Sequence, residues 1–206
     1  MLVASKILGV PNDEAIVGLC LITSMLLCLI LSHIHSPTAR KTFSSVFGTL
    51  IMIYAYGAGS MLLIPFNMLG YFFMNVLPRD KQHTFVMIFC GIMLTAFNMN
   101  AYLNDDLGYN ASVLAMITYV KQYIIATNYR DGKGDIDNWL TSREKKYALK
   151  KMPTFMEYYH YMHALSSCVV GPPFEYGDWK VFIEREGNYT KMRPFSNYVP
   201  AFSRLL

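Results

Sequence analysis

The sequence predicts an all-α protein, a polytopic transmembrane helical bundle that forms a single membrane domain over residues 1–206. Hydrophobic residues make up 53% of the chain and charged residues only 16%, whereas soluble domains carry about 25% charged residues. The charges are also clustered, because Arg40 and Lys41 are the only ones between Ala15 and Leu77. No soluble core buries so continuous an apolar stretch in so small a chain.

Four apolar stretches are long enough to cross a bilayer, since a helix rises about 1.5 Å per residue and the hydrocarbon core is about 30 Å thick. They cover about residues 15–34, 46–77, 84–103 and 111–129. Pro37 follows the first stretch and ends it. Gly57, Gly59 and Pro65 interrupt the second stretch, which is therefore either two shorter helices or one kinked helix.

A polar segment at residues 130–151 carries seven basic and four acidic side chains, the densest positive charge in the chain. Cytoplasmic loops of membrane proteins are enriched in Lys and Arg, so we expect this segment on the cytoplasmic side. Within it, the run from Thr141 to Glu144 offers a helix start with Thr or Ser as the cap. An apolar aromatic helix is expected over 154–170, ended by Gly171 because Pro172 disfavours the helical conformation of the residue before it.

Two sets of polar residues in this largely apolar chain are candidates for a metal site or a catalytic role. Glu157, His160 and His163 have an E-x-x-H-x-x-H spacing that would present all three to a metal from one helical face. Di-iron bundles need a matching motif on another helix, and the sequence has no second E-x-x-H, so we expect an interfacial helix and no metal site. Lys121 lies within the fourth apolar stretch, where it either snorkels or pairs with an acid, with a catalytic role as the less favoured alternative.

Several function classes are not indicated. The sequence has no G-x-S-x-G elbow, phosphate loop or dinucleotide fingerprint, and its mild net charge of +4 comes without the basic–aromatic stripe of a nucleic-acid binder. Cys20, Cys28, Cys90 and Cys168 lie in apolar stretches without a C-x-x-C pair, so we interpret them as small lipid- or core-facing residues. The residues alone predict a polytopic membrane protein with a cytoplasmic basic loop.

Two motifs in the second half carry a family resemblance. The run Pro153-Thr-Phe-Met-Glu-Tyr-Tyr, followed by Gly171-Pro-Pro-Phe-Glu-Tyr and an aromatic run to Glu184, resembles the lysophospholipid branch of the membrane-bound O-acyltransferases. Lys121-Gln and the run Tyr129-Arg-Asp-Gly resemble the upstream "K … D-G" segment of that branch. The match is ordered over about residues 11–191, and residues 153–184 are its specific part.

The resemblance implies a partial acyltransferase-type helical fold in the endoplasmic reticulum membrane. It implies membrane lipid partners and transfer of an acyl group from acyl-CoA, a co-substrate, to a lysophospholipid during phospholipid remodelling. It implies no resident cofactor. It leaves protein partners open. The residues that match its motif, and are therefore candidates for substrate binding, are Gly171, Pro172, Phe174, Glu175 and Tyr176.

The resemblance assigns no catalytic residue to this chain. In the family, the catalytic His and an upstream Asn lie well beyond the Gly-Pro segment, and none of the five histidines here matches that position. We therefore expect the N-terminal scaffold portion of a lysophospholipid O-acyltransferase, without activity as this chain alone. The alternative is a non-catalytic membrane module or complex subunit derived from the same family.

Overall fold

The computed structural model describes residues 12–103, 108–133, 141–169, 171 and 173–191, and all regular elements within them are helical. The elements are α2 (Asn12–His33), α3 (Pro37–Tyr56), α4 (Ala58–Val76), α5 (Gln82–Leu103), α6 (Gly108–Asp131), α7 (Ser142–Tyr147), α8 (Phe155–Met162), η2 (Leu165–Ser167), α9 (Tyr176–Glu184) and η3 (Gly187–Lys191). The protein is thus a helical bundle, as its composition predicts.

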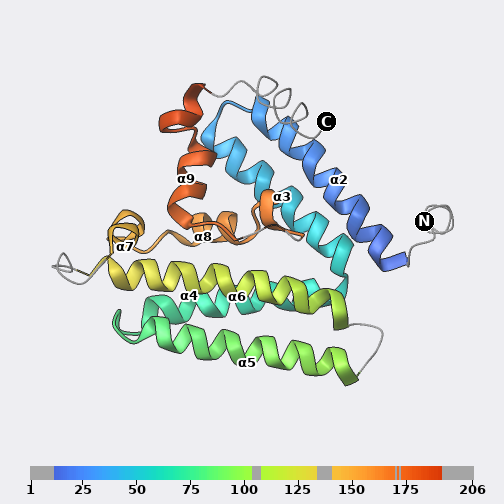
Figure 1. Cartoon of the computed structure of the whole chain (residues 1–206), viewed down its shortest axis with the longest axis horizontal. Coiled ribbons are helices and arrows are strands. Elements are labelled where there is room, and N and C mark those ends of the chain that lie inside the picture. The colour runs from blue at the N-terminus through green and yellow to red at the C-terminus, as the bar shows by residue number, and fades with distance from the viewer. Residues whose placement is uncertain (1–11, 104–107, 134–140, 170, 172, 192–206) are drawn as a thin grey trace.

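The long helices form two packed groups (Figure 1). Helices α4, α5 and α6 lie side by side, with α5 antiparallel to both neighbours, and α2 packs on α3 across this layer. The C-terminal ends of α4 and α6 and the N-terminal end of α5 lie together beside α7. The buried guanidinium of Arg40 joins α3 to α9, because it donates to the carbonyl of Ile183 at 2.8 Å and to that of Leu31 at 2.9 Å.

The interrupted apolar stretch divides into two helices at Gly57, one of the two arrangements that the sequence left open. Gly57 has a φ of 57°, a left-handed conformation that glycine adopts at little cost, and α4 begins at the next residue. Pro65 lies inside α4 without ending it. The first of the two helices begins earlier than the predicted residue 46, because Pro37 starts α3, a position that suits the fixed φ of proline.

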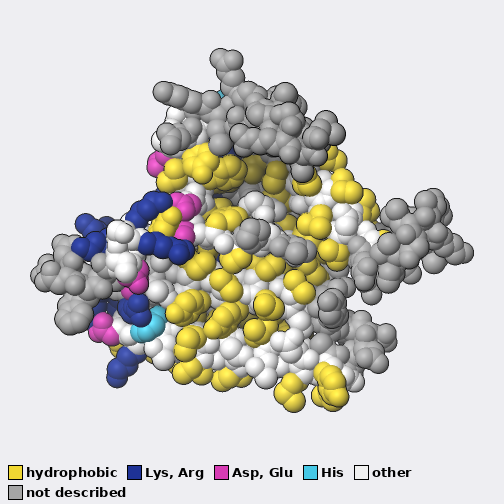
Figure 2. Space-filling view, in the orientation of Figure 1, with side chains coloured by type: hydrophobic (Ala, Val, Ile, Leu, Met, Phe, Trp, Pro, Cys, Tyr) yellow, Lys and Arg dark blue, Asp and Glu magenta, His cyan; other side chains and the backbone are white. Residues whose placement is uncertain are grey.

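Among the described residues, three helices are long and apolar enough to cross a membrane by length and composition: Ala15–His33 in α2, Gly59–Val76 in α4 and Gln82–Asn100 in α5. Their outward faces carry large apolar side chains, including Leu19, Ile22, Met25, Leu26 and Ile30 on α2, Met61, Leu62, Met68, Leu69 and Phe72 on α4, and Phe85, Met87, Ile88, Ile92 and Met99 on α5. Figure 2 shows apolar side chains across the bundle and charged ones gathered at one edge. This surface is that of an integral membrane protein.

The expected helix over 154–170 is shorter than predicted, since α8 ends at Met162 and a 3₁₀ turn follows at Leu165–Ser167. The last helical carbonyls bond to the side chain of Lys121 on α6, so the chain can leave the helix without exposing unpaired backbone groups. Residues 158–169, which we call the inner segment, are mostly buried, and they pack against α3 and α6. Irregular backbone inside a membrane bundle is tolerated where protein surrounds it in this way.

Candidate functional site

Lys121 anchors the inner segment from α6. Its ammonium donates to the carbonyl oxygens of Tyr161 at 3.1 Å and Met162 at 3.0 Å, and the residue is only 1% exposed. These carbonyls belong to the last turn of α8, where the helix dipole favours a positive charge. The geometry therefore gives Lys121 a structural contact inside the bundle and corrects the expectation that it snorkels or pairs with an acid.

A second set of polar contacts joins α4, α5 and α6 next to Lys121. The amide of Gln122 donates to Asn67 Oδ1 at 2.9 Å, and its oxygen accepts from Cys90 Sγ at 3.2 Å. The hydroxyl of Tyr158 donates to the carbonyl of Asn67 at 3.0 Å, which ties the inner segment to the same network. Gly70 faces this site, and a Cβ there would overlap the side chain of Gln122. The network explains why polar residues occur in apolar helices.

The three residues with metal-type spacing contact different partners. Glu157 accepts hydrogen bonds from Thr154 at the start of α8, whereas His160 Nδ1 lies 2.7 Å from the hydroxyl of Ser45 and His163 Nδ1 lies 3.1 Å from the carbonyl of Tyr159. Within the described ranges, no three His, Cys, Asp or Glu side chains lie close enough together to hold a metal ion. Their shared helical face serves to pack and cap α8.

A cavity of about 380 Å³ lies at the charged end of the bundle, between α6, α7 and the turn before α9. Its lining residues are Tyr123, Ile124, Thr127, Asn128 and Asp131 from α6, Thr141, Arg143, Glu144 and Tyr147 from and beside α7, and Glu175. The residues from α6 recur at intervals of three and four, so they share one helical face. No histidine lines this cavity.

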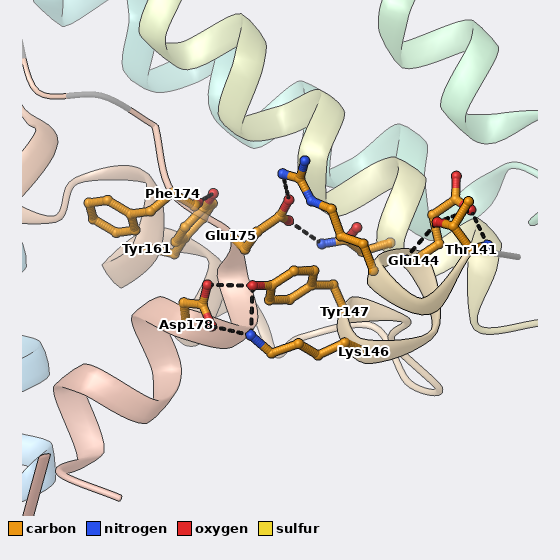
Figure 3. Close-up of polar contacts among 10 residues, drawn as sticks. Thr141, Glu144, Lys146, Tyr147, Tyr161, Phe174, Glu175 and Asp178 are labelled. Atoms are coloured by element: carbon orange, nitrogen blue, oxygen red, sulfur yellow. Dashed lines mark hydrogen bonds and ion pairs between the residues drawn. The ribbon is translucent and has the colours of Figure 1, made fainter. Parts of the chain in front are cut away.

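Glu175 connects the three walls of the cavity (Figure 3). Its Oε2 accepts from Asn128 Nδ2 at 3.0 Å, and its Oε1 accepts from the guanidinium of Arg143 at 3.1 Å. The two partners of the ion pair differ in exposure, because the Glu175 side chain is 17% exposed and that of Arg143 is 77% exposed. The carboxylate is thus a fixed part of the cavity wall, while the guanidinium reaches it from the solvent side.

Helix α7 has its own set of contacts. Thr141 and Glu144 form a capping box at its start, as their spacing predicts, and the hydrogen bonds from the Thr141 backbone and hydroxyl lower the pKa of Glu144. At its end, the hydroxyl of Tyr147 donates to Asp178 Oδ2 at 2.7 Å. Lys146 donates to Tyr147 at 2.8 Å, and that hydrogen bond together with the nearby Asp178 raises the pKa of Lys146. These contacts hold α7 against α9.

Of the five predicted substrate-binding residues, Glu175 reaches the cavity and three others have structural contacts. The carbonyl of Phe174 accepts from the hydroxyl of Tyr161 at 2.6 Å, and Tyr176 packs edge-on against the ring of Tyr161. A Cβ on Gly171 would press against the backbone of residue 166, so this position requires a close approach. Pro172 lies outside the described residues.

The cavity residues on α6 and α7 are not among the binding residues predicted from the sequence. A signal is present, because Tyr123, Thr127 and Asp131 are spaced four residues apart and therefore share one face of α6. The sequence places Arg143 and Tyr147 in the segment at residues 130–151 that is expected in the cytoplasm, and nothing in it indicates that this segment packs against Glu175. The cavity depends on that tertiary contact.

Comparison with known proteins gives several relatives, although no family model matches the chain. It is 22% identical over 188 residues to "Membrane-bound glycerophospholipid O-acyltransferase 2" of Homo sapiens, a match that covers 87% of this chain and 36% of the relative. It is 26% identical over 183 residues to "Lysophospholipid acyltransferase" of Schizosaccharomyces pombe, with the same coverage of 87% and 36%. For "Lysophospholipid acyltransferase 2" of Arabidopsis thaliana, identity is 25%, with 82% of this chain and 37% of the relative covered.

These matches confirm the resemblance to the lysophospholipid branch of the membrane-bound O-acyltransferases. The chain spans little more than a third of the length of the relatives that it matches. The resemblance therefore concerns a part of those proteins and most of this chain.

Proposed function

We propose that this chain, which resembles lysophospholipid acyltransferases over most of its length, is the front scaffold of an enzyme that transfers an acyl group from acyl-CoA to a lysophospholipid. The observation that carries the proposal is that relatives from an animal, a fungus and a plant with acyltransferase names match 82–87% of the chain. A membrane-embedded bundle with a polar cavity at its charged end supports it, because the acceptor is an amphiphile with a polar headgroup.

The reaction requires groups that we do not assign to this chain. A base takes the proton of the acceptor hydroxyl, whose oxygen attacks the thioester carbonyl. The new ester C–O bond forms, the C–S bond breaks, and the CoA thiolate leaves and is protonated. The transient oxyanion needs a hydrogen-bond donor. No histidine is among the described residues that line the cavity. We therefore propose that the 206-residue chain binds and positions the substrates and does not itself transfer the acyl group.

The proposal includes an orientation in the membrane. The basic residues at and beside α7 would face the cytoplasm of a multi-pass protein of the endoplasmic reticulum membrane, because cytoplasmic loops are enriched in Lys and Arg. The cavity would then open at the headgroup level of the cytoplasmic leaflet. Figure 2 supports this placement, since the charged side chains gather at that one edge.

A chimera tests the proposal. The chain replaces the matching segment of the Schizosaccharomyces pombe relative, and transfer of a labelled acyl group from acyl-CoA to lysophospholipid is measured in membranes. We expect activity above that of membranes without the chimera, and a loss of at least about tenfold on Lys121→Met, because misplacement of a wall of the site slows the reaction sharply. A membrane-inserted, folded chimera without activity would instead favour a non-catalytic module.

A further inference from the structure

The cavity at the charged end has the size and mixed lining of a ligand site. Its volume of about 380 Å³ is within the range of small-molecule pockets, about 300–1,000 Å³. Tyr123 and Ile124 provide an apolar side toward the bundle, while charged groups lie toward the surface. The hydroxyl oxygen of Thr127 is buried at the wall, and within the described part of the chain no hydrogen-bond partner reaches it.

The charges of the lining favour a cationic group. Three carboxylates, Asp131, Glu144 and Glu175, face a single guanidinium among the lining residues, that of Arg143. Arg130, which does not line the cavity, pairs with Asp131 at 2.7 Å and neutralises its charge. Among the lining residues, the two carboxylates of Glu144 and Glu175 then remain with the one guanidinium of Arg143. A ligand that carries only negative charge would be repelled at this wall.

The guanidinium of Arg143 occupies a position beside Glu175 that a ligand cation could take. Its guanidinium lies 3.1 Å from Glu175, yet the side chain is 77% exposed, so little holds it there besides the carboxylate. The rings of Tyr123 and Tyr147 line the same cavity, and the Tyr147 ring already holds the ammonium of Lys146 at 4.4 Å from its centroid. Carboxylates and tyrosine faces together are the groups that recognise ammonium ions in proteins. If Arg143 is displaced from Glu175, its guanidinium is free to pair with a phosphate, which it can bind with two hydrogen bonds.

We propose that this cavity binds the zwitterionic phosphate–amine headgroup of the lysophospholipid acceptor. The ammonium takes the place of Arg143 beside Glu175, near the tyrosines, and Arg143 turns to the phosphate. The inference rests on the proposed function and adds the headgroup class to it. Glu175 is then the residue that selects amine-bearing headgroups over phosphate-only or sugar-type headgroups.

Soluble headgroup fragments test the inference without requiring acyl transfer. Binding of phosphocholine, phosphoethanolamine and glycerol 3-phosphate to the 206-residue chain in lipid nanodiscs is measured by calorimetry. We expect the two amine-bearing fragments to bind and glycerol 3-phosphate not to bind. Glu175→Gln should weaken amine-fragment binding about tenfold, because hydrogen bonds to charged groups are among the stronger ones.

Glu184→Gln is the matched control. Glu184 is 18% exposed, nearly the same as Glu175, and it pairs with Lys41 at 2.5 Å at the opposite end of α9 from Glu175. This variant should bind the fragments like the unaltered chain. Equal binding by Glu175→Gln and Glu184→Gln, tighter binding of glycerol 3-phosphate, or no binding of any fragment would overturn the inference.

A second variant covers the case in which Glu175→Gln fails to fold. Arg143 is largely exposed, so Arg143→Gln should fold normally. It removes the competing cation from Glu175, and choline, which has no phosphate, should bind more tightly to this variant than to the unaltered chain. Unchanged or weaker choline binding would contradict the exchange. Acyl transfer by the chimera without any amine preference would remove this inference and leave the proposed function intact.

Discussion

Lys121 is the residue on which the inner segment most depends. Replacing it by Met removes the described donor of the buried Met162 carbonyl and leaves the Tyr161 carbonyl with backbone N–H donors only. An unsatisfied buried group costs about 1–3 kcal/mol, so we expect Lys121→Met to lower the free energy of unfolding by about that amount. For a chain of this length the melting temperature falls about 2–4 °C per kcal/mol. Thermal unfolding in detergent measures the shift.

The exposed Lys150 supplies the control, since Lys150→Met removes a charge of the same type from the surface and should leave the melting temperature unchanged. Equal melting temperatures for the two variants would mean that Lys121 does not hold α8.

Substitution of alanine for each of two glycines in long helices should have opposite effects on stability. A Cβ on Gly48 would overlap the carbonyl oxygen of His163, where the inner segment approaches α3 most closely. Gly48→Ala should therefore destabilise the protein by about 1–3 kcal/mol, the usual cost of overpacking. Gly91 on α5 has no atom near the position of a Cβ, so Gly91→Ala should stabilise it by about 0.5–1 kcal/mol through helix propensity. Changes of the same sign in thermal unfolding would contradict this packing.

At the residue scale, the sequence predicts which side chains are unusual but not their partners. Lys121 stands out in an apolar stretch, and its cost at depth is predictable. Its partners are carbonyls of α8, forty residues away, and a backbone acceptor leaves no mark in the sequence. Ser45 and His160 show the same limit, because their hydrogen bond joins α3 to α8 across more than a hundred residues.

At the element scale, the start of α8 depends on a capping box that responds to pH. Burial opposes ionisation of Glu157, but hydrogen bonds from Thr154 and the charge of Lys180 outweigh it, so its pKa in the folded protein is below the ordinary value. A lowered pKa means that the stabilisation is fully present above the unfolded-state pKa of about 4.3 and is lost as the pH falls through the folded-state value.

We therefore expect the melting temperature to fall on acidification below about pH 4.3, with a smaller fall in Thr154→Ala, which lacks the box. At neutral pH that variant should already be less stable by about 0.5–2 kcal/mol. Thr23→Ala is the control, because the hydroxyl of Thr23 bonds only to a carbonyl within α2 in the described contacts. A pH dependence that is identical in Thr154→Ala and the unaltered chain would contradict the role of Glu157.

Helix starts were more predictable than helix ends. The capping box at Thr141 follows from local spacing, and Gly57 was one of three expected break points. The sequence predicts that the helix continues to residue 170, because residues 163–169 contain no Gly or Pro and Gly171-Pro172 is the first local stop signal, whereas α8 ends at Met162. The true end is set by Lys121, a contact from another helix that satisfies the last carbonyls.

At the scale of the whole molecule, the uneven distribution of charge predicts one orientation in the membrane. Ser142 is exposed at the start of α7, and Leu103 is exposed at the opposite end of α5. In a cysteine-labelling experiment on intact organelle membranes, we expect Ser142→Cys to react with an impermeant reagent from the cytoplasmic side and Leu103→Cys to react only after the membrane is permeabilised. The reverse pattern would refute the orientation.

The fold class was the most predictable property of the molecule, because it follows from apolar length and charge distribution, which need no tertiary information. The packing of α7 against α9 was not predictable, since the ion pair between Arg143 and Glu175 and the contact between Tyr147 and Asp178 join segments more than thirty residues apart. The candidate cavity exists only through these contacts, so the sequence indicated a single member of it, Glu175.

The central claim is that this chain binds and positions the substrates without transferring the acyl group. It is tested most directly by measuring acyl transfer by the isolated chain. The purified 206-residue chain in lipid is given acyl-CoA and a lysophospholipid, and labelled acyl groups in phospholipid are counted beside a full-length relative. We predict no transfer above background, since losing general-base catalysis alone costs about 10²–10⁴ in rate. Transfer by the chain that is abolished by His160→Ala or His163→Ala would contradict the account and place the catalytic centre within the inner segment.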